Sequence, residues 1–77
     1  MVKSIHKKII IRSLRDLVVA NPKLRNEATS YFLSSEFKKH LLSSGLPLET
    51  DETIRDILSM SMVQQKVLVR DLVELLK

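Results

Sequence analysis

Few side chains of this sequence have the types and spacing that catalysis requires. Its two histidines, His6 and His40, are far apart in the chain, and neither belongs to a cluster of potential metal ligands. Serines are numerous, but none falls in a pattern with a histidine and an aspartate, and a serine nucleophile without a base is inert. The chain has no cysteine and no glycine-rich loop for a phosphate group. We therefore expect no enzymatic activity, no metal site and no cofactor of the protein's own.

Charge is the chemical feature that stands out. The 77 residues carry a net charge of +4, and the positive charge is concentrated at the N-terminal side. Residues 1–41 hold nine Lys and Arg against three Asp and Glu, whereas residues 42–77 hold four against six. A basic N-terminal half favours an acidic partner, which is a nucleic acid, a membrane surface or an acidic protein.

The N-terminal segment is basic, amphipathic and poor in acids, because the first acidic residue is Asp16. These are properties of a mitochondrial targeting segment, although a structural first helix has the same composition, and the two interpretations are compatible. No apolar run approaches the ~18–20 residues of a membrane span. We therefore expect no transmembrane segment.

The elements that position these charges are predicted to be helices. Asn21 is expected to cap a helix that starts at Pro22. Gly45 fits the left-handed position after a helix, and Thr50 or Asp51 is expected to cap the following helix.

Three helices follow from these boundaries, over residues 3–20, 22–42 and 51–76. We expect an all-α fold in which they pack as an antiparallel three-helix bundle, forming one domain over residues 1–77. The third helix is apolar around much of its circumference, so it must be buried on more than one side. In so small a bundle, this predicts a contact beyond the three helices.

The first helix has two distinct faces. Its apolar face includes Ile10 and Leu14, and the opposite side carries a row formed by Lys8, Arg12 and Arg15.

The segment IIIRSLRDL, together with SEFKKHL and TDETIRDIL, resembles the mitochondrial LYR-motif family, also called the complex-one LYR family. Ile10-Ile11-Arg12 stands where the family has Leu-Tyr-Arg, and Ser13-Leu14-Arg15 is a second possible register. SEFKKHL supplies the later phenylalanine among basic residues, Phe37, and TDETIRDIL resembles the start of the third helix of the family. The resemblance covers nearly the whole chain.

The resemblance implies a non-catalytic adaptor or accessory subunit in the mitochondrial matrix or on the matrix face of the inner membrane. Such three-helix modules bind acyl carrier protein, whose acyl chain enters between the helices, and dock it on a larger mitochondrial complex. The acyl-phosphopantetheine group belongs to the partner. The implied carrier-binding residues are Ile11, Arg12, Arg15, Lys38 and Lys39. The implied acyl-chain-lining residues are Ile10, Leu14, Phe37, Leu58 and Met62.

Two other interpretations stay open. The basic residues fit an ordinary solvated face, and the apolar ones fit an ordinary core or the seam of a homodimer. The contrasting function is that of a small dimeric helical regulator or interaction module. Such a regulator could bind nucleic acid. The expected turn of about eight residues before the third helix is too long for a helix-turn-helix, and that helix would begin with acidic Asp51 and Glu52. Nucleic acid is therefore the less favoured partner.

Overall fold

Residues 2–76, which the structure describes, fold into five helices where three long ones are predicted. The computed structural model describes the backbone of residues 2–76 and the side chains of residues 5–76, and this part of the chain contains no strand. The all-α prediction is confirmed, but the predicted second and third helices are each divided in two. The helices are α1 (Val2–Asp16), α2 (Pro22–Leu33), α3 (Ser35–Ser44), α4 (Glu49–Leu58) and α5 (Met62–Leu76).

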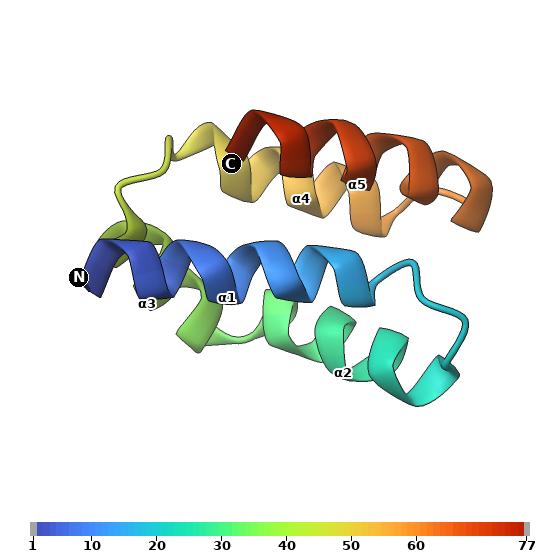
Figure 1. The fold of residues 1–77 in the computed structure, drawn as a ribbon. Coiled ribbons are helices and arrows are strands. Elements are labelled where there is room, and N and C mark those ends of the chain that lie inside the picture. The colour runs from blue at the N-terminus through green and yellow to red at the C-terminus, as the bar shows by residue number, and fades with distance from the viewer. Residues whose placement is uncertain (1, 77) are drawn as a thin grey trace.

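Helix α1 lies between the other elements (Figure 1). Helices α2 and α3 follow one another along one side of α1, and the antiparallel pair α4 and α5 lies along the other. The most extensive packing of α1 is with α3, and its next most extensive is with α5. The observed arrangement is thus a central helix, a bent helix pair and a helical hairpin.

Helix α1 ends four residues before the predicted boundary. The backbone amide of Val18 donates to the carbonyl of Arg15, which marks a tightened last turn. Beyond it, Asn21 has an extended backbone, as the residue before a proline prefers, and its side chain accepts a hydrogen bond of 2.9 Å from the Lys23 amide. The predicted cap at Asn21 with Pro22 as the first helical residue is confirmed.

The predicted second helix is interrupted at Ser34, whose backbone is extended. Both its amide and its hydroxyl donate to the carbonyl of Tyr31, at 3.0 and 2.6 Å. A serine that satisfies a helix-end carbonyl in this way competes with helix continuation. The prediction of one helix over residues 22–42 is wrong for this reason.

The predicted third helix is interrupted at residues 59–61. Ser59 donates from its hydroxyl to the Asp56 carbonyl, ending α4, and Ser61 accepts from the Gln64 amide, starting α5. The Ser61 hydroxyl also donates to the Oε1 atom of Gln64, at 3.5 Å. The Gln65 side chain donates to the Ile57 carbonyl at 3.0 Å and bridges the two helices. Consequently α5 folds back beside α4.

The joint before α4 matches the prediction in part. Gly45 has a φ of 78° and follows the last residue of α3, as expected for the left-handed residue at a helix end. Helix α4 begins at Glu49 and its cap position is Leu48, so the predicted cap at Thr50 or Asp51 is two or three residues late. Thr50 is instead buried in the first turn of α4.

The core combines aromatic and aliphatic side chains from all five helices. Phe32 and Phe37 meet edge to face, with ring centroids 5.0 Å apart and an interplanar angle of 83°, and Tyr31 packs edge-on against both rings. The residues with no exposed surface are Ile10, Leu14, Phe37 and Ile54.

Candidate functional site

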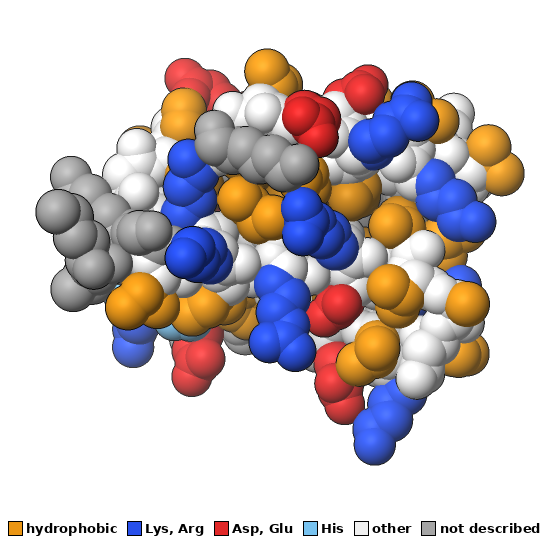
Figure 2. Space-filling view, in the orientation of Figure 1, with side chains coloured by type: hydrophobic (Ala, Val, Ile, Leu, Met, Phe, Trp, Pro, Cys, Tyr) orange, Lys and Arg blue, Asp and Glu red, His pale blue; other side chains and the backbone are white. Residues whose placement is uncertain are grey.

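The basic row of α1 is exposed, as its spacing predicts. Arg12 and Arg15 are exposed, and the adjacent Ile11 is half-buried against the core. Within residues 5–76 the only ion pair joins Arg55 to Asp51, at 3.3 Å, so both arginines of α1 are available to an external acidic group. Figure 2 shows Lys and Arg side chains gathered over α1 and the adjoining part of α5.

The predicted lysines Lys38 and Lys39 are also exposed, but on α3. Lys39 follows the completely buried Phe37 by two residues, which places it about 200° around the helix and away from the core. On α1, Arg12 likewise follows the buried Ile10 by two residues. Arg12 and Lys39 thus project from two different helices, α1 and α3, which pack against each other.

A different set of cations surrounds Arg15. Arg15, Lys66 and Arg70 line a shallow hollow of about 230 Å³ between α1 and α5, and Glu74 is the acidic residue of its lining. Its apolar floor is formed by Val18, Val69 and Val73. We name Arg12, Arg15, Lys66 and Arg70 the basic face.

Sequence reasoning did not single out Lys66 and Arg70, because they lie in the half of the chain where acids exceed bases. The available signal was their i, i+4 spacing, which puts both side chains on one side of α5.

The predicted acyl-chain-lining residues are part of the folded core. Ile10, Leu14 and Phe37 are completely buried, and Leu58 and Met62 are half-buried. None of these five residues lines the hollow between α1 and α5 or the three hollows along the α4–α5 hairpin. An acyl chain would reach Ile10, Leu14 and Phe37 only if the helices moved apart.

The fold joins the two histidines that are distant in sequence. The rings of His6 on α1 and His40 on α3 stack, with centroids 5.1 Å apart, and His40 Nδ1 shares a hydrogen bond of 2.7 Å with the Tyr31 hydroxyl. His6 Nδ1 is buried without a hydrogen-bond partner. Burial, reinforced by the negative charge of Glu36, raises the pKa of Tyr31 from 10.0 to about 12. The cluster ties α1, α2 and α3 together.

Within the described residues, no group of three or more His, Cys, Asp or Glu side chains is placed to hold a metal ion. No helix of residues 2–76 is long and apolar enough to cross a membrane.

The chain was compared with protein-family models, curated proteins and solved structures, and none of them matches it. The assignment of function therefore rests on the residues and their geometry.

Proposed function

We propose that the protein is a non-catalytic adaptor that binds an acidic protein partner through its basic face. The observation that carries this proposal is the gathering of Arg15 of α1 with Lys66 and Arg70 of α5 around one hollow. Arg12 lies about one turn before Arg15 on α1. All four side chains are exposed, and none is in an ion pair within residues 5–76. Unpaired cations orient an acidic partner through charge, and the apolar floor beside them adds binding affinity when the partner buries it.

The partner we propose is acylated mitochondrial acyl carrier protein, which the adaptor would dock on a larger complex in the mitochondrial matrix. This choice is supported by the resemblance of residues 10–12 and 37 to the LYR-motif family. The phosphopantetheine phosphate and the acidic helix of the carrier are suited to the guanidinium groups of Arg12 and Arg15. Lys38 and Lys39 would meet the carrier only where it extends around to α3.

The acyl chain would occupy the core beside Ile10, Leu14 and Phe37, and each methylene that it buries would contribute ~0.8 kcal/mol. Because these residues are completely buried in the free protein, this binding mode requires the helices to separate around the chain. The proposal therefore predicts that an acylated carrier changes the amide-exchange protection of α1 and α3, whereas an unacylated carrier leaves it nearly unchanged.

The direct test is native mass spectrometry of the protein co-expressed with a mitochondrial-type acyl carrier protein, with and without the acyl group. We expect a one-to-one complex that depends on acylation. Arg12→Glu should weaken it by about tenfold or more while changing the free energy of unfolding by no more than ~0.5 kcal/mol. Lys23→Glu, an equal charge change at the start of α2, is the matched control.

A homodimer indifferent to the carrier would contradict the proposal. Tight binding to duplex DNA that weakens steeply with salt would instead favour the regulator alternative.

A further inference from the structure

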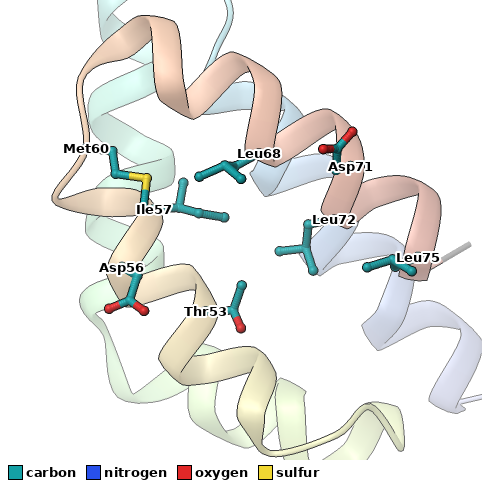
Figure 3. Close-up of a pocket in the computed structure, with 8 residues that line it drawn as sticks. All are labelled: Thr53, Asp56, Ile57, Met60, Leu68, Asp71, Leu72 and Leu75. Carbon is teal, nitrogen blue, oxygen red and sulfur yellow. The ribbon is translucent and has the colours of Figure 1, made fainter.

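A second surface runs along the outer side of the α4–α5 hairpin. Its centre is a hollow of about 290 Å³ between the two helices, toward which Ile57, Leu68 and Leu72 project (Figure 3). A hollow of about 360 Å³ adjoins it and shares Met60 and Leu68 with it. A third of about 340 Å³ shares Thr53, Leu72 and Leu75. Through these shared residues the three hollows form one groove, which we name the hairpin groove.

The hairpin groove exposes apolar side chains along the whole length of α5. Val63 at one end is 75% exposed, Leu75 at the other end is 81% exposed, and Val67 between them is 48% exposed. From Val63 to Leu75 the helix rises about 18 Å, or somewhat more than three turns. This length matches the apolar stripe of one short amphipathic helix.

The rims of the hairpin groove are acidic. Asp56 of α4 and Asp71 of α5 lie at opposite edges of the central hollow, with their carboxylates turned outward from it, and Glu49 lines the end nearest Pro47. None of the three takes part in the one ion pair found within residues 5–76. Lys7 is the only cation in the lining of the three hollows, and it lies at the same end as Glu49. The groove thus has the opposite sign to the chain as a whole.

We propose that the hairpin groove binds an amphipathic helix of another protein, with an apolar stripe of three to four turns flanked by Lys and Arg. The stripe would cover Leu68, Leu72 and Leu75, and the cations would pair with Asp56 and Asp71. A second copy of this chain fits less well, because a two-fold contact through the same groove would bring acidic rims toward each other. The inference deepens the proposed function, since it gives the chemistry of the assembly subunit on which the adaptor docks.

The test is a titration of the full-length protein against fluorescent 15-residue helical peptides, followed by anisotropy. One peptide carries leucines at helical spacing flanked by lysines, a second carries glutamates in place of the lysines, and a third has the lysine peptide's composition in scrambled order. We expect the lysine peptide to bind at least ~tenfold more tightly than the other two. Equal binding of the lysine and glutamate peptides, or no binding of the lysine peptide, would overturn the inference.

Variants locate the binding site. Leu75→Lys, at a side chain too exposed to hold the fold together, should weaken peptide binding by ~tenfold or more, and Asp71→Lys by about three- to tenfold. Glu27→Lys, the same charge change on the exposed side of α2, is the control and should leave binding unchanged. Loss of a homodimer in Leu75→Lys, measured by light scattering, would assign the groove to a second copy and overturn the inference.

The proposed function and the peptide-binding inference can fail independently of each other. Arg12 lies outside the hairpin groove, so Arg12→Glu should leave peptide binding unchanged, whether or not the substitution weakens carrier binding.

Discussion

The two sides of α1 are packed by different kinds of side chain. On the α2–α3 side, Phe32, Phe37 and Tyr31 interlock edge to face, and the stacked His6 and His40 close the cluster. On the α4–α5 side the contacts are aliphatic, and many of the apolar side chains of the hairpin remain exposed. Both sides leave apolar side chains exposed, Leu24, Leu33 and Leu42 on the α2–α3 side and Val63, Val67 and Leu75 on the hairpin, but those of the hairpin line its groove. We expect the fold to be more sensitive to loss of an interlocked ring than to loss of an aliphatic side chain of the hairpin, because a ring leaves the larger cavity.

The largest expected effect is a difference in the free energy of unfolding between substitutions on the two sides of α1. Phe37→Ala should lower the free energy of unfolding by ~3–5 kcal/mol, because it leaves a cavity at a completely buried site packed against other aromatic rings. This is a large part of the ~4–12 kcal/mol expected for a domain of this size. Leu72→Ala, at a half-buried site in the hairpin groove, should cost no more than ~1–2 kcal/mol. Urea unfolding followed by circular dichroism measures both, and equal losses would abolish the distinction.

A smaller effect should be confined to the hairpin. Ser61→Ala removes the acceptor that caps α5 and should cost ~1 kcal/mol. Hydrogen exchange should accelerate in the first turn of α5, with little change in α2 and α3. Ser43→Ala, at an exposed serine of α3, serves as the control. Acceleration spread evenly over the molecule would show that the two sides unfold as one unit.

An effect of similar size is expected for Tyr31 on the aromatic side. Tyr31→Phe removes the hydrogen bond to His40 and should cost about 1 kcal/mol at neutral pH.

The same residue predicts a pH dependence. Since folding raises the pKa of Tyr31 from 10.0 to about 12, the folded state holds the phenolic proton more tightly than the unfolded state does. The resulting stability is fully present below about pH 10 and is lost as the pH rises through 12. Tyr31 is the only tyrosine, so the ultraviolet absorbance of its phenolate follows the titration directly. Titration near pH 10 in the folded protein, or the same alkaline loss in Tyr31→Phe, would contradict the prediction.

Sequence reasoning predicts the helical class and the boundaries that local chemistry controls. The helix start at Asn21 and Pro22 and the helix end at Gly45 depend on the backbone preferences of these residues themselves. Both boundaries therefore follow from residue type. The interruption at residues 59–61 also had a local signal, the Ser-x-x-Gln pattern typical of a helix start, but the apolar periodicity on both sides of it favoured one long helix. Ser34 carries no comparable signal.

The candidate sites were less predictable, because they depend on which helix faces become neighbours. The exposure of Arg12 and Arg15 follows from the periodicity of α1. The proximity of Arg15 to Lys66 and Arg70 requires that α5 fold back along α1. The excess apolar surface of the predicted third helix could be read from the sequence. The groove between α4 and α5 could not, because it depends on how these two helices pack together. The stacking of His6 on His40 is likewise a product of tertiary packing.

The three-residue joint between α4 and α5 also governs how separate copies of the chain can exchange parts. Residues 59–61 alone interrupt what would otherwise be one helix over residues 49–76. If the joint straightened, Val69 and Val73 would leave the core, and α5 of a second chain would supply the same side chains in return. Short hinges of this kind are where domain swapping begins. Because alanine continues a helix more readily than serine, Ser59→Ala combined with Ser61→Ala would favour the intertwined dimer over the monomer.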